Sequence, residues 1–372
     1  MRKLRVAIIG GGIGGLSAAI ALHQMGAQAR VYEQARQLGE VGAGVALHRS
    51  SQRVLARLGL GQEVSRRGAR LSEFDLFTKD GTVVSHETYD AGAGQLGLHR
   101  ADLVAVLAAA LPAGFVHTGC RCVQFTQSNG SAVVSFGNGV SVSADVVVAA
   151  DGIHSGLQRY VVEPTDPVFS GVVAYRGLIP AARLPEWPKG LVTWGGDGKH
   201  LIAYPVRAGQ LINYVGFVPA DEQMLESWSA PGDPATLAAA FADWTPQARR
   251  LLSRVETTLK WGLYDREPLS RWTHGRLVLL GDAAHPMLPH MGQGANQAIE
   301  DALALAILLR GVSAADAPAA LMRYQTLRRA RTARVQRSAR VNGLRFDSAK
   351  PLSLNHSWVR DYDVEKEALA VR

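Results

Sequence analysis

Cysteine and long apolar runs are both scarce in this chain of 372 residues. Its two cysteines, Cys120 and Cys122, stand one residue apart, so in a strand their side chains point to opposite faces and cannot bridge without distortion. The longest uninterrupted apolar run covers nine residues, 103–111, whereas a membrane-spanning helix needs about 20. No apolar leader with a small-residue cleavage site follows the first residues. We therefore expect a reduced, cytoplasmic protein without a membrane span.

Acidic residues are fewer than basic ones, which leaves a formal net charge of +8. Much of the basic excess consists of arginines between residues 323 and 345. Their spacing spreads the charges around a predicted helix instead of forming one stripe, and no set of aromatic side chains interleaves with them to stack on bases. This pattern predicts a solvated helix near the C-terminus and no nucleic-acid partner.

Hydrophobic periodicity predicts a nucleotide-binding body interrupted by a lobe made mostly of strands. The apolar content of 47% is enough for a sizeable core, and the length suggests about two to three domains. The expected strands of the body cover 6–9, 29–33, 140–149 and 276–280, and its helices cover 16–25, 100–111 and 293–309. Strands dominate 161–269, hairpins are expected at Asp80-Gly81 and Asn138-Gly139, and a last helix is expected at 318–341.

A glycine fingerprint follows the first strand. Gly10, Gly12 and Gly15 occupy the three positions of G-x-G-x-x-G, which serve the tight turn, the approach of a pyrophosphate and the packing of helix on strand. The pyrophosphate then lies at a helix N-terminus, where unpaired N–H groups favour anions. Glu33 ends the second strand 18 residues after Gly15, where an acid binds ribose hydroxyls. The same string recurs at 92–97, but no apolar strand precedes it there, so we interpret it as a loop.

Two later stretches also end apolar strands, where ligands bind in open α/β sheets. Asp151 follows the strand at 146–150, and Asp282 follows the strand at 276–280. The segment 292–296 then opens the long helix, whose N-terminus can stabilise negative charge such as that of a reduced flavin. Each Asp-containing turn alone is compatible with an ordinary turn. In combination with the fingerprint, the two turns favour FAD over NAD.

These residues resemble the group A flavoprotein aromatic hydroxylases, the family of p-hydroxybenzoate and salicylate hydroxylases. The resemblance extends from Val6 to about Leu309 and is strongest to the branch of salicylate, 3-hydroxybenzoate and 6-hydroxynicotinate hydroxylases. It implies an α/β fold with a Rossmann-like FAD-binding body, an inserted mostly-β substrate lobe and a helical C-terminal region. The implied segments are 1–72, 99–160 and 273–315 for the body, 73–98 and 161–272 for the lobe, and 316–372 for the C-terminal region.

The resemblance also implies a cofactor, FAD, and a set of residues that bind it. The ADP half would lie against the fingerprint, the flavin-contacting arginine is Arg100, and Asp151 belongs to a motif that serves the pyrophosphate and the reduced nicotinamide. Asp282 would hold the ribityl chain. The implied cofactor-binding residues are Gly10, Gly12, Gly15, Glu33, Arg100, Asp151, Asp282, Pro286, Gly292, Gly294, Ala295 and Asn296.

The implied reaction uses NADH or NADPH as a transient co-substrate and O2, and it hydroxylates a small aromatic through a flavin C4a-hydroperoxide. A phenol reacts best as phenolate, so a base is useful. His200 and Tyr204 lie four apart in a predicted strand and therefore share a face, where the branch named above has substrate-lining residues. We expect His200 to assist deprotonation and Tyr204 to hydrogen-bond the substrate, with His290 as a second candidate base. A half-exposed strand histidine and a packing tyrosine would show the same spacing.

Several alternatives remain open on the sequence alone. The same fold serves larger aromatic, polyketide or antibiotic substrates, and a flavin-bound redox module without catalysis is a third possibility. The loop that starts at Leu47 reads His48-Arg49-Ser50-Ser51 where the family usually has Pro-Asn, so either His48 or Arg49 is a candidate contact for an anionic substrate, or a surface residue. Arg176 is a candidate for the cavity or for a salt bridge, and His285 is expected to fix its turn. We expect no metal site, and a monomer or homodimer.

Overall fold

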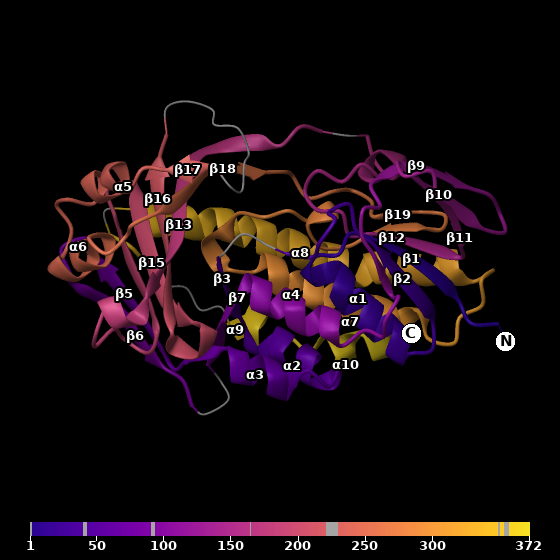
Figure 1. The fold of residues 1–372 in the computed structure, drawn as a ribbon, viewed down its shortest axis with the longest axis horizontal. Coiled ribbons are helices and arrows are strands. Elements are labelled where there is room, and N and C mark those ends of the chain that lie inside the picture. The colour runs from indigo at the N-terminus through magenta and orange to yellow at the C-terminus, as the bar shows by residue number, and fades with distance from the viewer. Residues whose placement is uncertain are drawn as a thin grey trace.

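A six-stranded sheet forms the centre of the body, and its strands come from three distant parts of the chain (Figure 1). The computed structural model describes residues 2–39, 43–90, 94–163, 165–220, 230–348, 350–352 and 357–372. In spatial order the strands are β19 (Thr273–His274), β20 (Leu277–Leu279), β12 (Val146–Ala149), β1 (Arg5–Ile9), β2 (Gln28–Tyr32) and β8 (Val116–His117). Neighbours pair in parallel except β19 with β20. The predicted α/β fold is confirmed.

Both faces of this sheet are covered, so its central strands are apolar without alternation. The valines of β12 are fully buried. On one side, α1 (Ile13–Gln24) packs against α7 (Gly294–Leu309) and α4 (Arg100–Ala109). The other side carries a small sheet of β9 (Cys122–Gln127), β10 (Ala132–Phe136) and β11 (Ser141–Ala144). The single strand predicted at 140–149 is wrong, because the chain leaves the hairpin with β10 after Ala144 and enters the parallel sheet at Val146.

An eight-stranded sheet forms the inserted lobe at the other end of the molecule (Figure 1). Its order is β17 (Pro231–Gly232), β18 (Thr258–Asp265), β13 (Val168–Pro180), β16 (Leu211–Pro219), β15 (Lys199–Val206), β14 (Leu191–Gly196), β5 (Glu73–Thr78) and β6 (Val83–Thr88). The β5–β6 hairpin is the one predicted at Asp80-Gly81, and it joins the sheet by parallel pairing of β5 with β14. Helices α5 (Pro234–Ala240) and α6 (Pro246–Leu252) cover one face, where they share an apolar cluster with β13 and β14.

A three-stranded sheet and two short helices connect the body with the lobe. The strands are β3 (Gly44–Leu47), β7 (Gln95–His99) and β4 (Ala69–Leu71), and the helices are α2 (Arg49–Arg57) and α3 (Gly61–Arg67). The loop predicted at 92–97 is wrong for residues 95–97, which begin β7, while residues 91–93 lie outside the described part. Pairing of β7 with both β3 and β4 supplies the hydrogen bonds that override the local glycine content. Short 3-10 helices are η1 (Gln158–Tyr160), η2 (Ala181–Arg183), η3 (Arg207–Gly209), η4 (Gly281–Ala283) and η5 (Pro289–Met291).

Helix α8 (Ala317–Asp347) spans both halves of the molecule (Figure 1). It packs on α7 in the body and reaches β14 and β15 in the lobe. The prediction of a solvated helix is wrong for one side of α8. Arg329, Arg334 and Arg337 are exposed, but Arg328 is fully buried and forms ion pairs with Glu300 at 3.0 Å and Asp301 at 2.7 Å. These acidic partners lie on α7, so local arginine spacing did not indicate them.

The C-terminal segment packs against the body. Its helices are α9 (Ser357–Arg360) and α10 (Val364–Ala370), and α10 contacts α7. The guanidinium of Arg331 lies 3.5 Å from the ring centre of Tyr362, and that of Arg334 lies 3.8 Å from the ring centre of Trp358. Cation–π contacts of this kind attach the end of the chain to α8.

A buried charge cluster joins α7, α8 and the turn after β20. The Asp301 carboxylate accepts hydrogen bonds from His285 Nε2 at 2.5 Å, from Arg328 Nε at 2.7 Å and from the Gly281 backbone N–H at 3.2 Å. Burial alone would raise the pKa of Asp301, but the charges of His285 and Arg328 and their hydrogen bonds lower it to about 2. His285 therefore fixes the turn that carries Asp282, as the sequence predicts.

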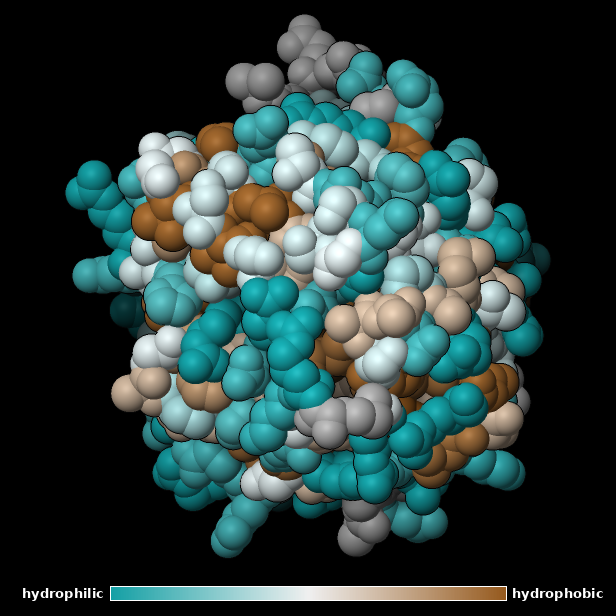
Figure 2. Space-filling view, turned by 90° about the vertical axis from the view of Figure 1, so that its right-hand side faces the viewer, coloured by the Kyte–Doolittle hydropathy of each residue, from teal (hydrophilic) through white to brown (hydrophobic). Residues whose placement is uncertain are grey.

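The end of the molecule that carries both termini is mostly hydrophilic, with apolar residues in separate patches (Figure 2). Within the described ranges, no helix is both long enough and apolar enough to span a membrane.

Replacing the central carboxylate should destabilise the whole fold. Asp301→Asn leaves the positive charge of Arg328 buried with one partner fewer, and we expect the free energy of unfolding to fall by roughly 3–5 kcal/mol. Asp361→Asn is the control, because the pair of Asp361 with Arg49 is exposed and 3.7 Å long, so its loss should cost less than about 1 kcal/mol. Urea unfolding of both variants measures the difference, and equal stabilities would contradict this role of Asp301.

The same carboxylate should contribute to acid sensitivity. Its pKa of about 2 in the folded chain lies below the value of about 3.9 for an unfolded aspartate. Protons therefore bind more readily to the unfolded state, and the contribution of Asp301 is present above about pH 4 and is lost as the pH falls through about 2. Unfolding series at several pH values should show a smaller acid-induced loss for Asp301→Asn than for the wild type.

Candidate active site

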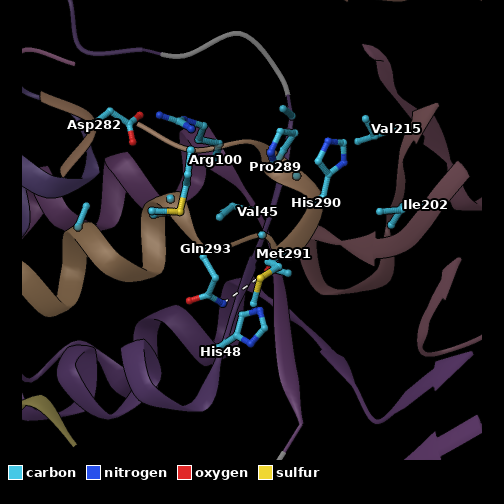
Figure 3. A pocket seen from close by; sticks show the side chains of 18 of the residues that line it. Val45, His48, Arg100, Ile202, Val215, Asp282, Pro289, His290, Met291 and Gln293 are labelled. Atoms are coloured by element: carbon cyan, nitrogen blue, oxygen red, sulfur yellow. Dashed lines mark hydrogen bonds between the residues drawn. The ribbon is translucent and has the colours of Figure 1, made fainter. Parts of the chain in front are cut away.

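A cavity of about 410 Å³ lies where the body, the lobe and the end of α8 meet. Figure 3 shows side chains of the body and the lobe that line it. The body contributes the β1–α1 turn, β3, the start of α4, η4, η5 and the first turn of α7. The lobe contributes side chains of β13, β15, β16 and β18, and α8 contributes Asn342 and Phe346. The cavity therefore joins a nucleotide-binding turn to a space walled mainly by apolar groups.

The glycine turn has the shape that a pyrophosphate needs. Gly10 has a φ of +110°, and a Cβ there would lie 2.2 Å from the Ala150 carbonyl oxygen. A Cβ on Gly15 would lie 2.0 Å from the Gly10 carbonyl oxygen, so this glycine is required for packing. A Cβ on Gly12 would meet no atom within 4 Å, and Gly12 lines the cavity beside the N-terminus of α1. This open cradle fits the diphosphate of a dinucleotide.

Glu33 and Asp151 support the loops around the cavity and are not among the residues that line it. The Glu33 carboxylate accepts hydrogen bonds from the Gly11 N–H at 2.6 Å and the Ala35 N–H at 2.8 Å. Burial raises the pKa of Asp151, while hydrogen bonds within its own loop, the first from Ser155, oppose the shift. The neighbours of Asp151 in sequence, Ala150 and residues 152–153, line the cavity instead.

Arg100 and Asp282 line the same part of the cavity (Figure 3). Arg100 begins α4, and its backbone N–H is held by the Ala43 carbonyl at 2.8 Å. Burial lowers the pKa of Arg100, whereas the nearby charge of Asp282 raises it. The structure thus brings together two predicted residues that are 182 positions apart in the sequence.

The start of α7 opens into the cavity. Gly292 precedes the helix in a left-handed conformation with a φ of +61°, and Gly294 is its first residue. These glycines, Pro286 and Ala295 all line the cavity. The N-terminus of α7, whose first N–H groups have no partner within the helix, therefore lies at the cavity, and the helix dipole favours a negative charge there.

Asn296 has a different position from its predicted neighbours. Its side chain is fully buried, is not among the groups lining the cavity, and makes four hydrogen bonds. The oxygen accepts from the His48 N–H at 2.8 Å and from the Ser51 hydroxyl at 2.5 Å. The amide nitrogen donates to the carbonyl oxygens of Ala46 at 3.0 Å and Gly292 at 2.7 Å. Asn296 therefore fixes the loop that carries His48 against the turn before α7.

The structure brings Tyr204 and His290 to the cavity and places His200 behind His290. Tyr204 and His290 line the cavity, whereas His200 is fully buried and is not among its lining residues. The expectation that His200 and Tyr204 both reach the cavity is therefore wrong for His200, because a shared strand face does not fix depth. His200 Nε2 lies 3.2 Å from His290 Nδ1, and its Nδ1 lies 2.6 Å from Asp347 Oδ1.

The protonation of these groups is constrained by burial. Burial, and then the proximity of His200, hold the pKa of His290 well below its usual value, so its ring is neutral. Burial also raises the pKa of Tyr204, against the opposing charge of Arg176, so its phenol stays protonated. The cavity therefore offers a neutral imidazole and a hydroxyl donor to one small ligand.

Arg176 supplies a cation to the lobe side of the cavity. Its guanidinium lies 4.4 Å from the ring centre of Trp261, and only a small part of the residue is exposed. Burial, and then the charge of Arg100, lower the pKa of Arg176 to about 10. Of the two loop residues considered as anion contacts, His48 lines the cavity, whereas Arg49 pairs with Asp361 at the surface.

Sequence reasoning missed the contribution of α8. Asp347 ends this helix and contacts His200, while the Asn342 amide donates to the His290 carbonyl at 2.6 Å. Gly343 lies against the His290 ring, where a Cβ would come within 2.7 Å of Cδ2 and 2.9 Å of Nε2. Glycine in a helix interior is costly, and this contact explains its presence. An isolated Gly343 in an arginine-rich helix was the one local signal available.

Comparison with known proteins agrees with this geometry. A family model described as FAD binding domain matches residues 3–339. A 3-amino-4-hydroxybenzoate 2-monooxygenase of Streptomyces platensis is 40% identical and covers 92% of this chain and 88% of its own length. A 6-hydroxynicotinate 3-monooxygenase of Bordetella bronchiseptica is 34% identical, with coverage of 99% and 97%. The structure of a salicylate hydroxylase substrate complex has a TM-score of 0.88 at 29% identity, with coverage of 100% and 98%.

The chain therefore belongs to the FAD-binding family, and within it to the FAD-dependent aromatic hydroxylases. FAD is its cofactor, and the open cradle at Gly12 fits that cofactor.

The four hydrogen bonds of the Asn296 side chain, here called the Asn296 clamp, can be tested by two substitutions that remove different numbers of them. Asn296→Ala leaves the His48 N–H and the carbonyls of Ala46 and Gly292 buried without this partner, and we expect a loss of roughly 3 kcal/mol or more in the free energy of unfolding. Ser51→Ala removes the single hydroxyl that is shared between Asn296 Oδ1 and the His48 carbonyl, and should cost about 1 kcal/mol. Chemical unfolding measures both values, and equal losses would show that Asn296 is not the centre of the clamp.

Proposed function

We propose that this hydroxylase acts on a small aromatic acid or N-heterocycle that already carries a ring hydroxyl. One observation supports this substrate class most strongly: a neutral His290, the Tyr204 hydroxyl and the Arg176 cation border one small cavity whose other walls are mainly apolar. Such a set suits a flat ring with one acidic hydroxyl and one anionic group. The relatives named for 3-amino-4-hydroxybenzoate and 6-hydroxynicotinate share that chemistry.

The cofactor would lie along the body side of the cavity. The fingerprint glycines and the N-terminus of α1 would hold the pyrophosphate, and Glu33 would hold the adenosine ribose as well as the Gly11 N–H, since a carboxylate accepts about four hydrogen bonds. Arg100 and Asp282 would hold the region towards the flavin, and Asp151 would shape the loop beside it. Pro286 and the α7 residues Gly292, Gly294 and Ala295 would border the ring system, with Asn296 as their support. When bound, FAD supplies electron transfer from the nicotinamide and activation of O2.

The protein residues would prepare the substrate ring for attack. His290 would accept the proton of the ring hydroxyl, because its neutral imidazole is the base at the cavity wall. A phenolate is more electron-rich than a phenol, so the proton transfer raises the reactivity of the ring. The Tyr204 hydroxyl would donate a hydrogen bond to the same ligand and orient it.

Arg176 would bind the anionic group of the substrate. An anion next to its guanidinium would oppose both effects that lower the pKa of Arg176, namely its burial and the charge of Arg100. Trp261 would keep the guanidinium in place by stacking. The reductant would be NADH or NADPH, bound transiently as a co-substrate. Both nucleotides are held inside cells, so this requirement favours a cytoplasmic location.

The substrate class can be tested directly on the FAD-loaded protein. We expect NADH or NADPH oxidation to be stimulated by at least one of salicylate, the hydroxybenzoates, 3-amino-4-hydroxybenzoate and 6-hydroxynicotinate, with equal O2 uptake and a hydroxylated product. Benzoate is the matched control, because it has the carboxylate without the ring hydroxyl and should give no hydroxylated product. If none of these acids stimulates oxidation, the proposed substrate class is wrong.

Variants at the cavity should separate chemistry from cofactor binding. His290→Gln removes the proposed base, and we expect kcat for hydroxylation to fall by about 100-fold with unchanged FAD content. Tyr204→Phe keeps the ring but removes the hydroxyl donor, and should raise KM for the aromatic acid by roughly tenfold. Steady-state kinetics with product quantification provides both numbers. A His290→Gln enzyme with normal kcat would exclude His290 as the base.

The fingerprint can be tested by two alanine substitutions that differ in space. Gly12→Ala places a methyl group in the open cradle, so it should leave the stability of the FAD-free protein unchanged but weaken FAD binding by about tenfold or more. Gly15→Ala collides with the Gly10 carbonyl and should lower the stability of the FAD-free protein as well. Flavin fluorescence titration and thermal unfolding measure the two effects. Equal behaviour of the two variants would contradict the assignment.

A further inference from the structure

We propose that Asp347 is a positioning residue that completes a proton relay from the cavity through His290 and His200 towards the surface. The proposal rests on the proposed function for the identity of the proton, which comes from the ring hydroxyl of the substrate. It adds a group from the last residue of α8, far from every glycine motif in the sequence. Its basis is a continuous line of hydrogen-bonded side chains.

The three side chains are close enough to exchange protons. His290 Nδ1 lies 3.2 Å from His200 Nε2, and His200 Nδ1 lies 2.6 Å from Asp347 Oδ1. Exposure rises along the line after His200, because the His200 side chain is 0% exposed and the Asp347 side chain is 17% exposed. The relay thus connects a cavity group with a carboxylate that water reaches.

The partners determine where the protons lie. An ionised carboxylate only accepts, so His200 Nδ1 donates to Asp347. In neutral His200 the other nitrogen, Nε2, is then an acceptor, and His290 Nδ1 must donate to it. Because His290 is neutral, its own Nε2 carries no proton, and it is the nitrogen left for the substrate. The carboxylate at the end of α8 therefore fixes which nitrogen of His290 acts as the base.

The relay moves one proton without leaving a charge on His290. The O–H bond of the substrate breaks as its proton bonds to His290 Nε2, and the O–H electron pair stays on the substrate oxygen as phenolate. The His290 Nδ1 proton passes to His200 Nε2 at the same time. His290 ends neutral in its other tautomer, and the new positive charge lies on His200, next to the Asp347 carboxylate. This placement suits a cavity in which burial disfavours a charged His290.

The surrounding packing holds this line in place. The Phe217 ring stacks on His200 with centres 4.1 Å apart and a 20° angle between planes, and the Phe346 ring lies 5.4 Å away. Gly343 and Asn342 hold His290 from α8. Within the described ranges, the titratable groups facing His200 are Asp347 from α8 and His290 from η5, while its ring neighbours Phe217 from β16 and Phe346 from α8 are uncharged.

Asp347→Asn tests the relay because it keeps the size of the side chain and removes its charge. We expect kcat for hydroxylation to fall by about tenfold or more, with KM for the nicotinamide and FAD content unchanged. Without the carboxylate, a cationic His200 is less favourable, so the acid limb of the pH–rate profile should move to lower pH by about one unit. Asp316→Asn, at the other end of α8, is the matched control and should leave both the limb and kcat unchanged.

A purely structural role of Asp347 would give another result. In that case Asp347→Asn would lose stability or FAD without moving the acid limb, and the relay would be wrong. Asp347→Glu offers a second check, because a restored carboxylate should return the limb towards its wild-type position. An unmoved limb in the Asn variant, with kcat within twofold of wild type, would also overturn the proposal.

A readout without substrate separates this proposal from the proposed function. In the FAD-loaded protein labelled with ¹⁵N-histidine, His200 and His290 signals are assigned by their absence in His200→Gln and His290→Gln. At neutral pH we expect the ¹⁵N shifts of wild type to show His200 and His290 both protonated at Nδ1, and Asp347→Asn to change the tautomer distribution of His200. An Nδ1 without a proton on either ring, or tautomers that Asp347→Asn leaves unchanged, would overturn the coupling. If wild type hydroxylates none of the aromatic acids but shows these tautomers, the substrate class fails and the coupling of Asp347 to His200 stands.

Discussion

The site depends on the hydrogen bonds and ion pairs that the buried Asp301 carboxylate makes. The carboxylate joins the turn after β20, through the Gly281 N–H and His285, to α8 through Arg328. That turn carries Asp282, α7 presents its first turn to the cavity, and α8 brings its last turns to the lobe. A buried ion pair adds little net stability over an apolar contact, but breaking one partner is costly. The cluster therefore acts chiefly to fix the relative positions of three elements that supply cavity residues.

Burial explains the chemistry of the cavity better than any single residue type. The same desolvation keeps His290 neutral, keeps the Tyr204 phenol protonated and lowers the pKa of Arg176. Burial lowers the pKa of His290 and of Arg176 but raises that of Tyr204, because it disfavours the charged form of each group. The proposed substrate, an acid that carries a ring hydroxyl, would suit all three groups. When bound, it would complete the electrostatics of the cavity.

Sequence patterns predicted the features that depend on near neighbours. The turn at Gly10, Gly12 and Gly15 and the parallel strands of the body follow from local periodicity, and both are found. The depth of His200 was not predictable, because a period of two gives the face of a strand but not what lies in front of it. The burial of Arg328 depends on acidic partners on α7, and the contact of Asp347 with His200 joins residues 147 positions apart. Such pairings exist only once the helices are packed.

The length of α8 has a consequence for how this fold can be recombined. One helix anchors its first half on α7 and ends against β14 and β15, so the wall around His290 is made by two segments that are distant in the sequence. A chimera that exchanged only the lobe strands would replace His200 but keep the original end of α8, which contacts residue 200 through Asp347. The lobe and the last two turns of α8 would have to be inherited together. Recombination of this enzyme must therefore preserve the contact between the lobe and α8, whose two sides come from separate stretches of the chain.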